Sequence, residues 1–126
     1  MNTRIVIPVQ DETGLQVRLA QHFGRAPFYA VVDLDENNKL VDFKTELNRG
    51  EHVGGTGHPH EHLLSLQPNI FVVYGMGPGC LRSLQSTGVR VLKAVGNTAE
   101  DIIEQFKKGQ LSELEGGCEH SHHHNC

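Results

Sequence analysis

The sequence contains no tryptophan and few other aromatic residues, with five phenylalanines and two tyrosines in 126 residues. Surfaces on which bases or sugars stack are therefore scarce. No apolar run reaches the roughly 18 residues that a membrane-spanning helix needs. The N-terminus, MNTRIVIPV, enters a strand-like pattern at once and lacks the charged and apolar regions of a signal peptide. We therefore expect no membrane partner and a cytoplasmic location.

Basic side chains are also few and scattered. The chain has 11 Lys and Arg against 15 Asp and Glu, which gives a formal net charge of −4. Because neutralising a phosphate backbone needs a basic face, nucleic acid is not an expected partner. The three cysteines are an odd number and do not indicate a disulfide framework. In a reducing cytosol they are free thiols, metal ligands or redox groups, and nine histidines accompany them.

The apolar pattern predicts an alternation of strands and helices. Short runs rich in β-branched residues predict five strands, at 4–9, 28–35, 40–47, 70–74 and 89–94. Apolar positions at helical spacing predict three helices, at 60–67, 80–87 and 99–108. The last helix has Asn97 or Thr98 as its N-cap and Gly109 as its stop.

The order of these elements predicts an α/β fold with a mixed five-stranded sheet flanked by three helices. The first, fourth and fifth strands lie among helices and are expected to be parallel and central, with right-handed crossovers. The second and third strands, joined by the polar turn 36–39, form an antiparallel hairpin at the flank. We expect one domain over 1–111. Because apolar residues are few after Leu114, we expect a flexible Cys/His-rich tail over 112–126.

A glycine- and histidine-rich loop precedes the first predicted helix. Neutral imidazole is the commonest protein ligand for Zn, Cu, Ni and Fe, and glycine lets a loop fold around an ion. The spacing H-x-H-x-H differs from the H-E-x-x-H of helical zinc proteases. A solvated loop with incidental histidines is the alternative, but four histidines in eleven residues favour metal ligation. The candidate ligands are His52, His58, His60 and His62.

The C-terminal sequence CEHSHHHNC is a second candidate metal-binding tract. Cysteine and histidine at this density indicate metal binding by composition alone, and these ligands suit Zn, Ni, Cu or an iron–sulfur surface. A purification tag is the alternative, although a tag is usually an unbroken run of histidines and Ser121 interrupts this one. The candidate ligands are Cys118, His120, His122, His123, His124 and Cys126.

The sequence GMGPG leads from the fourth strand, a continuous apolar run, into the second helix. Glycines at the carboxyl end of a strand bring backbone N–H groups close to a ligand, and the helix N-terminus adds a partial positive charge. Gly75, Gly77 and Gly79 are therefore candidates for an anion site. Cys80 at that N-terminus is expected to have a lowered thiol pKa and to be a better thiolate ligand. The alternative is a plain tight turn followed by a buried cysteine.

The remaining histidine, His22, lies in HFGRAPFY before the second strand. A single histidine beside an aromatic residue, here Phe23, is more often structural than catalytic. No Ser–His–Asp or Cys–His set can be recognised from the spacing of the residues. The chain is therefore not expected to be an enzyme.

Four segments of the chain carry a resemblance in their order and spacing: HFGRAPFYAVVDLD, the glycine-rich loop, IFVVYGMGPGCLRSLQSTGVRV and NTAEDIIEQFKKGQL. Together they resemble the dinitrogenase iron–molybdenum cofactor biosynthesis family, from about Arg4 to Leu111. The resemblance implies a ribonuclease-H-like fold, which by itself does not imply nuclease activity. The acidic cluster that such an enzyme needs is absent, because Asp33, Asp35 and Asp42 lie on the hairpin without convergent partners.

Members of this family include carriers of iron–molybdenum cofactor precursors, a protein that binds a molybdenum–copper sulfide cluster, and iron–sulfur storage proteins. The resemblance implies that this chain binds, carries or stores a metal–sulfur cluster, with other cluster-assembly proteins as partners. Such a cluster is a large polyanion that His22, Arg25 and the backbone N–H groups of 75–79 would receive. Two alternatives stay open. One is a divalent-metal chaperone or buffer that uses the tail, and the other is a regulatory domain that binds a small anion or a partner.

Overall fold

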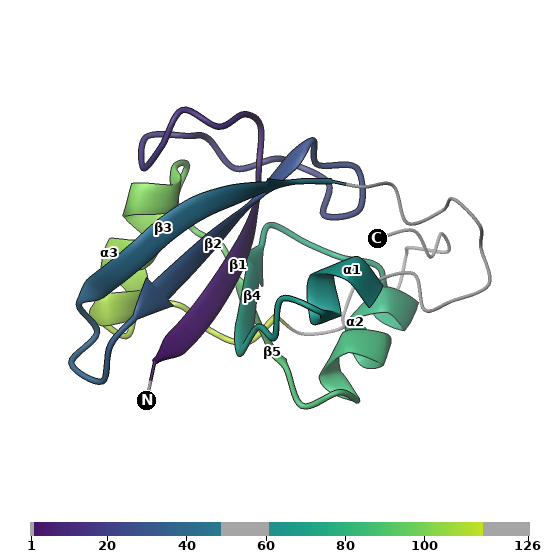
Figure 1. Ribbon diagram of the computed structural model, residues 1–126. Coiled ribbons are helices and arrows are strands. Elements are labelled where there is room, and N and C mark those ends of the chain that lie inside the picture. The colour runs from purple at the N-terminus through teal and green to yellow at the C-terminus, as the bar shows by residue number, and fades with distance from the viewer. Residues whose placement is uncertain (1, 49–60, 115–126) are drawn as a thin grey trace.

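Five strands form one mixed sheet in the order β3-β2-β1-β4-β5 (Figure 1). The computed structural model describes residues 2–48 and 61–114. The strands are β1 (Thr3–Val9), β2 (Phe28–Leu34), β3 (Leu40–Leu47), β4 (Ile70–Val73) and β5 (Arg90–Lys93). Each lies within two residues of a predicted strand at either end, and the predicted α/β class with a mixed five-stranded sheet is confirmed.

The hairpin of β2 and β3 is antiparallel, and β1, β4 and β5 are mutually parallel, as the sequence predicts. The sequence predicts a central position for β5, and this prediction is wrong. The strand lies at an edge of the sheet. Residues 112–114 run antiparallel along it. The Lys93 N–H donates to the Ser112 carbonyl (2.8 Å), and the Leu114 N–H donates to the Val91 carbonyl (2.8 Å). The sheet-forming part of the chain therefore extends beyond the predicted boundary at 111.

Two helices of two or more turns pack on the sheet, α2 (Pro78–Gln85) and α3 (Ala99–Lys107). The predicted helix at 60–67 is reduced to a single turn, α1 (Glu61–Leu64). It ends early because Gln67 takes a positive φ of 60° and Pro68, which follows, cannot continue a helix. In the described part of the chain no helix is both long and apolar enough to cross a bilayer.

The core forms two layers, one on each face of the sheet. Ile102 and Ile103 of α3 pack with one set of strand side chains, while Leu81 and Leu84 of α2 pack with the other set. Figure 1 shows α3 on one side of the sheet and α1 with α2 on the other side. Because β1 and β4 are covered on both faces, their sequences read as continuous apolar runs instead of alternating ones.

Candidate functional site

The connecting loops that carry the predicted core site leave the same edge of the sheet. Since β1, β4 and β5 are parallel, their carboxyl ends lie together, and the loops 10–27, 74–77 and 94–98 start there. The antiparallel strand β2 begins at this edge, and β3 ends there. His22, Arg25 and the GMGPG loop are therefore at one end of the fold, as the predicted topology requires. Ligands of open α/β sheets bind at such carboxyl ends.

Backbone and side-chain hydrogen bonds join these loops into one surface. The Tyr74 hydroxyl donates to the Gly96 carbonyl (2.8 Å), linking the loop after β4 to the loop after β5. The Leu19 N–H donates to the Asn97 carbonyl (3.0 Å), which links the loop after β1 to the same segment. The loop positions are thus coupled to one another.

The loop that carries His22 and Arg25 is anchored to the core by packing and hydrogen bonds. Phe23 is 1% exposed and meets Phe71 edge-to-face with a centroid distance of 5.2 Å. The Phe23 carbonyl accepts a hydrogen bond from the Tyr29 hydroxyl (2.6 Å), and Asn48 donates to the Ala26 carbonyl (2.7 Å). His22 and Arg25 are themselves exposed. The loop is anchored through its apolar residues, while its imidazole and guanidinium groups face solvent.

The N-terminus of α2 lies at this edge and has the features of an anion site. Its N-cap, Gly77, has no side chain to accept from the helix N–H groups, and no acidic residue occupies the first turn. A Cβ atom built on Gly75 or Gly79 would meet no atom within 4 Å, and neither glycine has a positive φ. Neither local packing nor backbone strain requires glycine at these two positions. Among the described residues, none fills the space that a side chain at Gly75 or Gly79 would take, as an anion site at this helix end requires.

Cys80 is the first-turn residue of α2 that the sequence singles out. It is 6% exposed and packs with Phe23 and Leu81 in the core layer beneath the site. Its sulfur is disulfide-bonded in this structure, which differs from the free thiol or thiolate ligand expected from the sequence. The lowered thiol pKa applies to the reduced form and stays a prediction.

Sequence reasoning missed Arg18 and Tyr74. Arg18 is exposed and forms an isolated β-bridge with Thr98, which brings it to this edge. Burial raises the pKa of the Tyr74 phenol, and the positive charge of Arg18 partly opposes that rise. Arg18 is therefore a second cation at the site besides Arg25. No local pattern marks it, because only the pairing of the loop after β1 with residues 97–98 places it there.

None of the ten predicted metal ligands has a side chain among those that the structure describes. His52, His58, His60 and the six tail ligands lie outside the described residues, as does the side chain of His62. Among residues 2–48 and 61–114, no group of three His, Cys, Asp or Glu side chains is placed to hold a metal ion. The described part of the site thus offers N–H groups and cations and does not supply a complete ligand shell for an ion.

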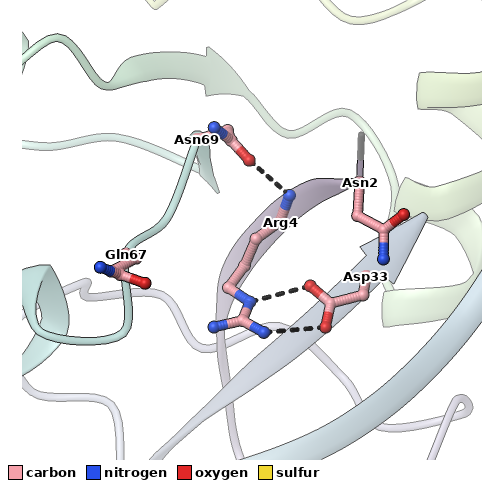
Figure 2. Close-up of a pocket in the computed structure, with 5 residues that line it drawn as sticks. All are labelled: Asn2, Arg4, Asp33, Gln67 and Asn69. Atoms are coloured by element: carbon pink, nitrogen blue, oxygen red, sulfur yellow. Dashed lines mark hydrogen bonds and ion pairs between the residues drawn. The ribbon is translucent and has the colours of Figure 1, made fainter. Parts of the chain in front are cut away.

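A separate pocket of about 180 Å³ lies at the opposite end of the sheet, where the parallel strands begin (Figure 2). Its walls are Asn2, Arg4, Asp33, Gln67 and Asn69. The Arg4 guanidinium donates to both carboxylate oxygens of Asp33, at 2.8 Å and 2.9 Å, and to the Leu66 carbonyl at 2.7 Å. These hydrogen bonds lower the pKa of Asp33 and raise that of Arg4.

The partner of Asp33 is a cation, so this pairing adds no carboxylate to the hairpin aspartates. Asp33 is buried, faces Asp42 across the hairpin, and is neutralised by Arg4. The sequence does not reveal the pair because the two residues are 29 positions apart. Since the charged groups of this pocket already bind each other, we assign it a structural role.

Residues 3–109 match the family described as Dinitrogenase iron-molybdenum cofactor. The chain belongs to this family. The match includes His22, Arg25, the GMGPG loop and Cys80, and it ends before the Cys/His-rich tail. The family resemblance read from the sequence is therefore confirmed.

Several solved structures share the fold of this family member. The protein PH0822 gives a TM-score of 0.74 at 22% identity, over 88% of this chain and 94% of its own. The apo form of the orange protein (ORP) from Desulfovibrio gigas gives 0.72 at 21% identity, over 90% and 94%. The protein MJ0327 from Methanocaldococcus jannaschii gives 0.72 at 15% identity, over 91% and 97%. At these identities the likeness shows the fold, and no curated protein matches the chain.

Proposed function

We propose that this chain binds and carries a metal–sulfur cluster, of iron–molybdenum or iron–sulfur type, for other proteins of cofactor assembly. The observation that carries the proposal is the open N-terminus of α2, which has neither a capping side chain nor an acidic residue, in a member of the iron–molybdenum cofactor family. The protein acts as a carrier and not as a catalyst. Its sheet order and its family also support the ribonuclease-H-like assignment of the fold.

The chemistry of the edge fits a polyanionic cargo. The N–H groups of Gly75, Met76, Gly77 and Gly79 and the partial positive charge of α2 supply hydrogen bonds and a favourable potential, while Pro78 has no N–H to contribute. Arg25 and Arg18 supply two exposed guanidinium groups, which form strong hydrogen bonds with anionic acceptors. The His22 imidazole supplies a metal ligand. Binding through many weak, mostly non-covalent contacts suits a carrier, because the cargo has to leave again.

The histidines of the 52–62 loop and the Cys/His-rich tail extend this proposal. Asn48, the last described residue before this segment, directly follows β3 at the carboxyl edge. The four histidines would add metal ligands to those of the core site. For the tail, Zn, Ni or Cu binding has only composition in its favour, and a metal chaperone is therefore the second candidate.

Anaerobic reconstitution of the full chain with iron, sulfide and molybdate tests the main proposal. We expect a coloured complex of fixed stoichiometry. The paired substitutions H22A and R25A should lower the amount of cluster retained, whereas R82A, which removes an exposed guanidinium further along α2, should leave it unchanged. A protein that stays colourless in all these mixtures contradicts the proposal.

Truncation after Gly117 separates the cluster site from the second candidate. A cluster held at the carboxyl edge should survive this truncation, because the described N–H groups and cations remain. Uptake of Zn, Ni or Cu, measured by metal analysis of protein purified without a nickel column, should be lost if the tail binds these ions. Both chains are kept with reductant, so that Cys80 is a thiol in each. Loss of both activities in the truncated chain would then place the cluster on the tail and contradict the proposed site.

A further inference from the structure

The outer edge of β3 is the open edge of this sheet. At the opposite edge, residues 112–114 pair with β5 and occupy its hydrogen-bonding groups. No described residue pairs with the outer side of β3, and Figure 1 shows this strand along the rim of the sheet. An unpaired strand edge presents N–H and C=O groups that another strand can complete.

Exposed apolar side chains are concentrated on the same strand. Four large apolar side chains are exposed in the described part of the chain, and three of them lie on β3. They are Leu40 at 39%, Val41 at 56% and Leu47 at 54%, whereas Val95 at 60% lies elsewhere. Such a concentration on one edge is a feature of contact surfaces.

The two faces of β3 differ in chemistry. Phe43 and Leu47 stand opposite Val32 and Phe28 of β2, on the side of the sheet that α3 covers. Lys44 and Glu46 stand on the other side and are exposed and half-buried, respectively. Their ammonium and carboxylate groups lie 3.8 Å apart on one strand, a weak pair that is free to exchange partners.

This pattern is self-complementary when two copies of β3 run antiparallel about a two-fold axis at Thr45. Lys44 of each copy then faces Glu46 of the other, and Phe43 of each copy faces Leu47 of the other. Opposite charges and apolar pairs directly across a strand pair stabilise it. Moving the axis to Lys44 would place lysine against lysine and Asp42 against Glu46. Moving it to Phe43 would pair Asp42 with Lys44, but it would also set Leu40 against Glu46 and include the irregular register of the hairpin at Val41.

We propose that two copies of this chain associate through β3, in antiparallel pairing centred on Thr45, to form one continuous sheet. A two-fold contact of this kind uses the same surface on both chains.

Sedimentation equilibrium of the full chain tests this pairing, with chelator and reductant present so that the Cys/His-rich tail does not link chains. We expect a concentration-dependent dimer. The K44E and E46K substitutions should each weaken it about tenfold or more, because two attractive pairs become repulsive. An equimolar mixture of K44E and E46K should form a heterodimer, since every carboxylate at position 44 then faces an ammonium at position 46.

The matched control is K93E, which reverses an exposed lysine on β5 at the other edge of the sheet. It should dimerise as the unmodified chain does, and circular dichroism should show that all three variants are folded. The proposal is overturned if the unmodified chain stays monomeric, if K93E weakens the dimer as much as K44E does, or if the mixture of K44E and E46K stays monomeric.

Discussion

At the scale of single residues, Arg4 joins three separate parts of the chain. Its side chain binds Asp33 on β2 and the Leu66 carbonyl after α1, and its backbone N–H donates to the Asn69 side chain (2.7 Å). The Arg4 side chain is 32% exposed and that of Asp33 is 12% exposed, so the pair is partly shielded from water. A bidentate, charge-assisted pair of this kind contributes more than an ordinary surface ion pair.

The D33N substitution should lower the free energy of unfolding by about 1–3 kcal/mol at neutral pH, because it removes a charge-assisted bidentate pair. The folded-state pKa of Asp33 is below its unfolded value, so the contribution is complete above about pH 4 and is lost as pH falls through the folded pKa. Urea unfolding between pH 2 and 7 should therefore show the two proteins converging in acid.

The matched control for this prediction is D42N. Asp42 faces Asp33 across the hairpin, but it is exposed. Its substitution should change stability by no more than about 0.5 kcal/mol. Equal losses in D33N and D42N would show that the Arg4 pair is not the cause.

A second prediction at this scale concerns Gly79. Because a Cβ atom there meets nothing and φ is not positive, G79A should leave stability unchanged or raise it by up to about 1 kcal/mol. The added methyl group stands beside the α2 N-terminus, so cluster retention after anaerobic reconstitution should fall. Q85A, at the exposed far end of α2, should retain cluster like the unmodified chain. Full retention by G79A would exclude the α2 N-terminus as the binding surface.

At the scale of secondary-structure elements, the ends of the two long helices are built in opposite ways. Thr98 caps α3 by accepting from the Asp101 N–H (3.2 Å), and the Asp101 carboxylate accepts from the Thr98 N–H (3.3 Å). The sequence predicts this cap from its residue types. The N-terminus of α2 has no such cap. The first N–H groups of α3 are bound by capping side chains, whereas those of α2 have no capping side chain.

The T98A substitution should therefore destabilise the protein by about 1 kcal/mol, the usual loss when an N-cap hydroxyl is removed. T98S retains the hydroxyl and should recover most of this loss. Urea unfolding measures both effects, and faster amide hydrogen exchange in the first turn of α3 should accompany T98A alone. A T98S variant as unstable as T98A would mean that the methyl group, and not the cap, matters.

Residues 112–114 give a prediction about the β5 edge. A chain that ends at Leu111 should be less stable by about 1–3 kcal/mol than one that ends at Leu114. The shorter chain lacks two backbone hydrogen bonds to β5 and the ion pair of Glu113 with Arg90 (2.7 Å). It also exposes the β5 edge, so light scattering should rise with concentration. In the longer chain, E113A keeps the backbone pairing and should lose less than half as much.

At the scale of the whole molecule, the order of strands and helices can be predicted because each element has a local pattern of apolar and capping residues. The apolar runs of β1 and β4 and the capping residues of α3 predict those elements within two residues. The length predicted for the helix at 60–67 is wrong. Its leucines favour a helix, but Gln67 takes a positive φ that the local sequence does not indicate. The edge position of β5 was missed, since strand order depends on crossovers and not on local composition.

The core site was predictable in part for the same reason. Parallel strands bring their carboxyl ends together, so the order of elements alone predicts that His22, Arg25 and the GMGPG loop share one edge. The sequence does not predict the position of Arg18 at the carboxyl edge, nor the ion pair between Arg4 and Asp33. Each depends on side chains or loops that are distant in sequence and meet only when the sheet forms.

The amino-acid sequence by itself determines the α/β class, the family and the open, glycine-rich start of α2, because these follow from local patterns and motif order. Only the tertiary structure decides that Arg18 reaches the carboxyl edge, that Arg4 neutralises Asp33, and which strands of the described chain lie at the edges of the sheet. Long-range pairing between strands and loops sets all three, and no local run of residues encodes it.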